Sequence, residues 1–305
     1  MSRFFMNLHA HLELSQIAAP FECPSGVSRQ TTANWIGEIL RFRRSPVYNA
    51  RKGIERGLQR QELIETTSLI ADIVPNRCPA FSQHYISGSA EVFPFTELIA
   101  WKPEQAETEW KALPDCYGLS PHAPHTVCPE LLEKAVQSGK PLAMHLAETP
   151  EELQLLRDHS GPLLEMMRQA DPDYDPKKTL PGKRPMDYLQ LLAAAPLSLI
   201  IHGNYLAADE MRFLAGHRET MIAVYCPRSH AYFRHSAYPL RQMLDLGVCV
   251  ALGTDSTASS PDLSMAAEVR FAAAQHPAVP PETINRLASQ ERIQKLLLHF
   301  SGGIR

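Results

Sequence analysis

Short apolar runs alternate with longer amphipathic stretches along most of the chain. The segment 248–252 is entirely apolar, as is typical of a strand buried on both faces. Segments such as 129–138, 151–157 and 207–215 instead show the period of a helix. Strands separated by helices predict a parallel sheet. Eight strands are predicted, starting near Phe4, Thr67, Glu91, Cys116, Leu142, Leu197, Met221 and Val248.

Eight strand–helix units in 305 residues suit an α/β fold, the closed (β/α)8 TIM barrel, formed by residues 1–305 as one domain. An open doubly wound sheet is the alternative, but no glycine-rich phosphate turn follows an early strand. We therefore favour the barrel. Its active site is expected at the C-terminal ends of the strands, where parallel strands present their loops.

Composition narrows the function classes. The net charge of −3 comes without a basic stripe, which argues against nucleic acid as a partner. No apolar stretch is long enough to span a membrane, and the N-terminus lacks the plan of a signal peptide. We expect a cytoplasmic protein that acts on a small molecule. The six cysteines show no CxxC spacing and are interpreted as reduced packing residues.

Residues able to bind a metal or transfer a proton follow four of the predicted strands. His9 and His11 lie two apart on a strand, so both rings point to the same side. A single histidine at a strand end is more often structural, but a recurrence at four strand ends predicts a site. These residues are His9, His11, His145, Glu148, His202 and Asp255.

Six short motifs, in this order, resemble the amidohydrolase superfamily. They begin at His9, Ser120, His145, His202, Cys226 and Leu252, and read HAHLELS, SPHAP, HLAET, HG, CPRS and LGTDS. The resemblance is to the aminohydrolase branch, which includes cytosine, guanine and S-adenosylhomocysteine deaminases and chlorotriazine hydrolases. The segment 34–44 is similar to the corresponding segment of aminodeoxyfutalosine deaminases.

The resemblance implies one divalent metal ion, Zn²⁺ or alternatively Fe²⁺, whose bound water is the nucleophile. Its implied ligands are His9, His11, His145 and Asp255. Glu148 would protonate a ring nitrogen of the substrate, His202 would orient or deprotonate the water, and Asp255 would also accept a proton. Members with two metals usually carry a bridging lysine at the fourth strand. This chain has His122 in that region, which favours a single metal.

The substrate would be an amino-substituted heterocycle, such as the 6-aminopurine nucleosides aminodeoxyfutalosine and S-adenosylhomocysteine. Two alternatives remain: hydrolysis of another C–N or C–Cl bond, and a barrel that binds a ligand or partner without catalysis. His125 stands where relatives commonly have tyrosine. Candidate substrate-binding residues are His122, Arg228, His230 and Trp35, with Glu38, 41–44, Glu97 and His235 as weaker candidates. Trp35 and the arginines near it are equally well explained by the buried stripe and solvated face of a helix. Arg228 could instead pair with a carboxylate at the rim, and His122 could instead hold its loop in place.

Three further expectations concern the periphery of the barrel. Relatives usually carry a β-sandwich built from segments before and after the barrel, whereas only eight residues precede His9 here. Either the sandwich is missing or the reading frame is trimmed. If it is missing, the exposed surface that it would cover favours homo-oligomer formation or marginal stability. The proline-rich segment 171–185 is interpreted as a lid or a surface insertion. Residues 283–300 are predicted to form the last helix.

Overall fold

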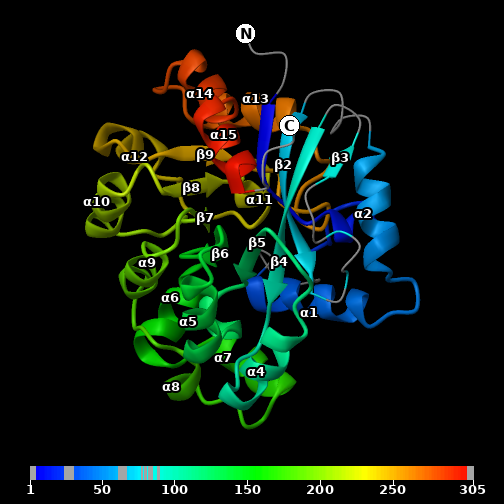
Figure 1. Ribbon diagram of the computed structural model, residues 1–305. Coiled ribbons are helices and arrows are strands. Elements are labelled where there is room, and N and C mark those ends of the chain that lie inside the picture. Colours follow the sequence, from blue (N-terminus) through cyan, green and yellow to red (C-terminus); the bar gives the residue numbers. More distant parts are fainter. Residues whose placement is uncertain are drawn as a thin grey trace.

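A parallel β-barrel surrounded by helices forms the molecule (Figure 1). The structure is a computed structural model that describes residues 5–23, 31–60, 67–76, 78, 81, 85–87 and 90–300. Eight parallel strands pair in chain order, which confirms the predicted α/β barrel. They are β1 (Phe5–Ala10), β2 (Thr67–Pro75), β4 (Ala90–Leu98), β5 (Gly118–Pro121), β6 (Leu142–Leu146), β7 (Ser198–His202), β8 (Met221–Tyr225) and β9 (Val250–Leu252).

The barrel closes between its first and last strands. A parallel bridge joins Ala10 to Asp255, and the Asn7 side chain both donates to Thr254 Oγ1 (2.8 Å) and accepts from Thr254 N (3.1 Å). Gly253 is required at this seam because a Cβ there would lie 2.9 Å from the His9 backbone nitrogen. The closure therefore brings the first and last strands of the sheet side by side, together with the polar residues that they carry.

The strand starts agree with the predicted ones to within two residues, although Phe4 lies outside the described residues. At β9 the difference has a local cause. Val248 N donates to Met243 O and so terminates the preceding helix, which delays the strand to Val250. The short strand β3 (Tyr85–Ser87), antiparallel to β4, was not predicted.

Most helices lie outside the barrel (Figure 1). Eight of those in the described part of the chain begin with proline, whose fixed φ and missing N–H suit the first helical position. The helices are α1 (Thr32–Arg43), α2 (Ala50–Leu58), α4 (Pro103–Lys111), α5 (Pro129–Gln137), α6 (Pro150–Asp158), α7 (Pro162–Ala170), α8 (Pro176–Thr179), α9 (Pro185–Leu192), α10 (Ala208–Gly216), α11 (Pro227–Tyr232), α12 (Leu240–Leu246), α13 (Met265–Gln275), α14 (Pro281–Leu287) and α15 (Glu291–Phe300), with 3₁₀ turns η1 (Leu12–Leu14) and η3 (Pro124–Thr126).

The apolar core has two main parts. One fills the inside of the barrel and includes Leu8, Phe95 and Leu199, all at most 1% exposed. The other lies between the strands and the outer helices and includes Leu132, Leu189 and similar side chains. Burial on both faces is what the apolar strand sequences predict.

The prediction of one last helix over 283–300 was wrong. Two helices, α14 and α15, occupy this region, and the chain turns at residues 288–290. Ser289 Oγ donates to Asn285 O, and Gln290 Nε2 donates to Val250 O. These side-chain hydrogen bonds replace the helical ones at the turn and attach it to β9.

The proline-rich segment 171–185 is packed rather than projecting. Tyr174 is 2% exposed and its hydroxyl donates to His125 O (3.1 Å), while Thr179 Oγ1 donates to Trp101 O (3.0 Å). The short helix α8 lies within it. The segment therefore supports the loop that carries His125. The interpretation as a surface insertion did not include this contact.

All strands in the described residues belong to the barrel sheet. No disulfide joins the cysteines in the described part of the chain. Four of them are buried, but Cys23 is exposed and so is not a packing residue of the core. In the described ranges, every helix is too short or too polar to cross a bilayer.

Candidate metal and catalytic site

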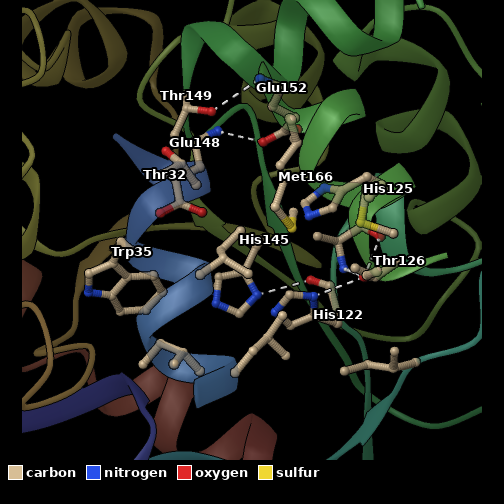
Figure 2. Close-up of a pocket in the computed structure, with 18 of the residues that line it drawn as sticks. Thr32, Trp35, His122, His125, Thr126, His145, Glu148, Thr149, Glu152 and Met166 are labelled. Atoms are coloured by element: carbon tan, nitrogen blue, oxygen red, sulfur yellow. Dashed lines mark hydrogen bonds between the residues drawn. The ribbon is translucent and has the colours of Figure 1, made fainter. Parts of the chain in front are cut away.

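The candidate residues come together at the C-terminal mouth of the barrel. His9 lies in β1 with His11 just after it, His145 lies in β6, and His202 ends β7. Asp255 follows β9 and pairs with β1. The parallel strands open into one cavity, which His11, His145, His202 and Asp255 border together with Glu148, while His9 lies buried behind them (Figure 2).

Three histidines form the centre of the site. Nitrogen atoms of His9, His11 and His145 all lie within 4.8 Å of one another. His11 Nε2 is 3.3 Å from His145 Nε2, and His9 Nε2 is 3.6 Å from Asp255 Oδ1. The structure thus brings together the four residues that the resemblance implies as metal ligands.

The buried polar atoms of this cluster fit a divalent cation. Both ring nitrogens of His9, which is completely buried, and Nδ1 of His11 have no hydrogen-bond partner in the described structure. A buried polar atom without a partner costs about 1–3 kcal/mol. Three imidazoles and one carboxylate are a donor set that binds Zn²⁺ and leaves a coordination position for water. The residues therefore fit the metal that the fold family implies.

Neighbouring groups orient two of these side chains. His145 Nδ1 donates to His122 O (2.9 Å), which leaves its Nε2 lone pair directed at the cluster. Asp255 Oδ2 accepts from Ser229 Oγ (2.6 Å) and Ser259 Oγ (2.9 Å). The two serines hold one carboxylate oxygen and leave Oδ1 facing His9.

Burial sets the charge state of the cluster. It lowers the pKa of His9, His11 and His145, which keeps the imidazoles neutral and able to bind a metal. Burial alone would raise the pKa of Asp255, but the contacts with His9, His202 and His11 together outweigh it, so the pKa lies below its usual range. Asp255 is therefore the anionic member of the set.

The backbone is strained at three strand ends of the site. Ala147, His202 and Asp255 have φ of 53°, 67° and 59°, in the left-handed region that residues other than glycine rarely adopt. Such conformations cost about 1–3 kcal/mol each and persist only where the surroundings impose them. Here they turn the chain abruptly where the strands end, at or beside the residues that face the cavity.

Glu148 and His202 form a second pair beside the histidines. Glu148 Oε1 lies 3.6 Å from His202 Nε2. Burial and the nearby Asp255 carboxylate raise the pKa of Glu148 to about 8, so its carboxyl group is protonated at neutral pH. Burial lowers the pKa of His202. The pair combines a neutral acid that can donate a proton with a neutral base that can accept one.

Helices α1 and α7 pack against each other and supply apolar walls to the cavity. Trp35 from α1 lines it, while the indole Nε1 donates to Ala258 O (3.1 Å). His122 lines the opposite wall. Because the Thr126 hydroxyl donates to Ala123 O, the 2.9 Å hydrogen bond between His122 and Thr126 is donated by Nδ1, which leaves Nε2 as an acceptor. The other apolar lining residues of these helices are Ile36, Ile39, Leu40, Leu163, Met166, Met167 and Ala170.

The weaker candidates on α1 have structural partners. Arg43 borders the cavity but pairs with the buried carboxylates of Glu13 (2.6 Å) and Glu97 (3.6 Å). Glu38 pairs with exposed Arg41. Both interpretations of the segment 34–44 thus hold in part. Trp35 lines the cavity, as a substrate-binding residue would, and Ile39 is buried, as the apolar stripe of a helix would be.

Two predicted substrate-binding residues do not border the cavity. The Arg228 guanidinium donates to Glu268 Oε1 and Asp262 Oδ1, both at 2.6 Å. His230 packs between Tyr225, His235 and Tyr238. The geometry gives Arg228 a structural role: it neutralises the completely buried Glu268 carboxylate beside α11, the helix that also carries Ser229.

Arg228→Met is therefore expected to lower the free energy of unfolding by about 3–5 kcal/mol, because Glu268 would stay buried without its partner. Urea denaturation measures this loss. The double variant Arg228→Met/Glu268→Met serves as the control and should recover most of the stability. Unchanged stability together with a raised KM would instead support the predicted role in substrate binding.

Several contributing residues were not predicted. Glu152 accepts from the backbone nitrogens of Ala147 (2.9 Å) and Glu148 (3.0 Å), and so fixes the strained turn. Ser229 and Ser259 hold Asp255. Ser229 belongs to a motif noted in the sequence, whereas no sequence signal distinguishes Ser259 or Glu152 from ordinary polar residues.

Comparison with known proteins identifies related sequences. The family model described as "Amidohydrolase family" matches residues 5–291. The aminodeoxyfutalosine deaminase of Deinococcus radiodurans is 34% identical over 189 residues, which cover 56% of this chain and 43% of that protein. The 5-methylthioadenosine/S-adenosylhomocysteine deaminase of Pyrococcus furiosus is 34% identical over 160 residues, covering 51% and 33%. The chain spans less than half the length of these relatives.

A solved structure shares the fold. The Helicobacter pylori aminofutalosine deaminase in complex with methylthio-coformycin superimposes with a TM-score of 0.76. The superposition covers 96% of this chain and 73% of that one, with 18% sequence identity. This likeness supports the barrel architecture on which the site is built.

Proposed function

This chain belongs to the amidohydrolase family, and from that premise we propose that it is a metal-dependent hydrolase that deaminates an amino-substituted heterocycle. The heterocycle is a 6-aminopurine nucleoside such as aminodeoxyfutalosine or S-adenosylhomocysteine. The observation that carries the proposal is the buried Glu148 carboxyl group 3.6 Å from His202 Nε2, beside the cluster of His9, His11, His145 and Asp255.

His9, His11, His145 and Asp255 would hold one divalent cation, with Zn²⁺ preferred by the donor set and Fe²⁺ as the second choice. When bound, such a cation acts as a Lewis acid and lowers the pKa of a coordinated water towards about 7. The protein residues then have to hold the heterocycle and move protons.

Glu148 donates its proton to the ring nitrogen beside the amino-bearing carbon, while His202 or Asp255 accepts a proton from the attacking water. The C–O bond forms in this step. A proton is next delivered to the amino nitrogen, the C–N bond breaks and ammonia leaves. The oxygen of the water remains on the ring as the carbonyl group of the product. The amino nitrogen leaves as ammonia, so the step consumes one water and releases one ammonia.

The cavity walls and the relatives support this substrate class. Apolar side chains of α1 and α7 with the Trp35 indole suit a planar ring. The two relatives described above are deaminases of adenosine-like compounds by name. Glu148 and His202 also argue against a barrel that only binds a ligand, since binding alone requires no pair of proton-transfer groups.

Ammonia release by the zinc-loaded protein tests the proposal. The panel comprises aminodeoxyfutalosine, S-adenosylhomocysteine, methylthioadenosine, adenosine, guanine and cytosine. We expect at least one 6-aminopurine nucleoside to be deaminated with kcat/KM above about 10⁴ M⁻¹s⁻¹, and chelator treatment to abolish the activity until zinc is returned. No ammonia from any compound, with zinc bound, would contradict deamination and favour hydrolysis of another C–N or C–Cl bond.

A further inference from the structure

His125 is a buried polar residue of the cavity that the proposed chemistry does not use. It lies in η3, is 6% exposed and borders the cavity. Neither ring nitrogen has a hydrogen-bond partner in the described structure. A ring with two unsatisfied nitrogens is poorly explained as a packing residue, because its desolvation is not compensated.

The ring lies away from the reacting centre. His122 stands between, with ring centroids 4.9 Å from His145 and 6.3 Å from His125. Figure 2 shows Trp35 at the left, His145 and His122 in the lower centre, and the His125 ring above His122 beside Met166. A heterocycle that reacts beside Glu148 therefore presents to His125 the substituent that it carries, and not the carbon that loses its amino group.

The loop holds the ring in place. The backbone oxygen of His125 accepts from the Tyr174 hydroxyl (3.1 Å), which belongs to the packed segment 171–185. Apolar side chains of α7, among them Leu163, Met166 and Met167, line the same cavity. The imidazole is thus prepositioned in a mostly apolar end of the cavity, where one hydrogen bond discriminates strongly between ligands.

We propose that His125 is a specificity-determining residue that hydrogen-bonds a hydroxyl group on the substituent of the heterocycle, so that the site selects a nucleoside over a free or alkylated base. The inference rests on the proposed function. Burial lowers the pKa of His125 to about 4, so the ring is neutral and offers one donor and one acceptor. A sugar hydroxyl matches this pair, because it also donates and accepts.

His125→Phe tests the inference with two probes, adenosine and 9-methyladenine, which share the heterocycle but differ in the sugar. Titration calorimetry of the zinc-loaded protein carrying Glu148→Gln, which should bind both probes but scarcely turn them over, gives the dissociation constants, and ammonia release is followed in parallel with Glu148 in place. We expect the variant to bind adenosine roughly 5- to 150-fold more weakly, with the affinity for 9-methyladenine unchanged. His125→Gln retains an amide donor and acceptor, so we expect partial recovery for adenosine.

Met166→Leu is the matched control, since it alters the same end of the cavity without removing a polar atom, and it should affect both probes equally. Equal weakening of both probes by His125→Phe, or none, would overturn the inference. So would a native protein that binds adenosine no better than 9-methyladenine. If His125→Phe selectively weakens adenosine binding but the native protein releases no ammonia, the deaminase proposal fails while the role of His125 stands.

Discussion

Replacing His145 with alanine is expected to remove metal binding and turnover together. His145 contributes a buried imidazole whose Nδ1 is held by His122 O and whose Nε2 faces His11. Loss of groups that merely orient a ligand costs about 10- to 100-fold in metal affinity or activity, so loss of the ligand itself should cost more. Metal content after dialysis, measured by mass spectrometry, and ammonia release from the same sample test the expectation.

His217→Ala provides the control for this experiment. His217 caps the C-terminus of α10, where its Nδ1 donates to Phe213 O, and it is remote from the cavity lining. This variant should keep one equivalent of zinc and normal turnover. If His145→Ala also kept one equivalent with full turnover, the proposed ligand set of His9, His11, His145 and Asp255 would be wrong.

Glu148→Gln is expected to keep the metal and to lose roughly 10²- to 10⁴-fold in kcat. Glutamine has nearly the same shape and can still donate a hydrogen bond, but it cannot transfer a proton. The buried carboxyl group beside His202 supplies that proton in the proposed reaction. Steady-state kinetics on the best substrate of the panel, together with metal content, separate the loss of proton transfer from the loss of metal.

Glu165→Gln on α7 is the matched control, because it makes the same carboxyl-to-amide change on an exposed side chain. It should leave kcat unchanged. Near-normal turnover of Glu148→Gln would exclude Glu148 as the proton donor. Loss of the metal in that variant would instead place Glu148 in the metal-binding cluster, which the geometry gives to three histidines and Asp255.

The barrel and the position of its site were both predictable from local patterns. An apolar run followed by a polar residue marks the C-terminal end of a buried parallel strand, and all such ends meet at one mouth. His9, His145 and His202 were therefore expected at the same place before their distances were known. The recurrence of the pattern at several strands carried more information than any single histidine.

The roles of Arg228 and His125 were not predictable in this way. Arg228 follows a strand just as the site residues do, yet its guanidinium binds Glu268, 40 residues further along the chain. His125 became a candidate only when the structure showed its two nitrogens buried without a partner. Neither property has a local sequence signal, because each depends on which distant side chain fills the neighbouring space.

The sequence by itself therefore determined the fold class and the set of residues at the barrel mouth, since period, strand ends and residue chemistry are local properties. The tertiary structure alone decided which of those residues touch, how α1 and α7 wall the cavity, and how segment 171–185 supports His125. These arrangements arise from packing between segments far apart in sequence. Their energies depend on burial and on partners that no single stretch of the chain specifies.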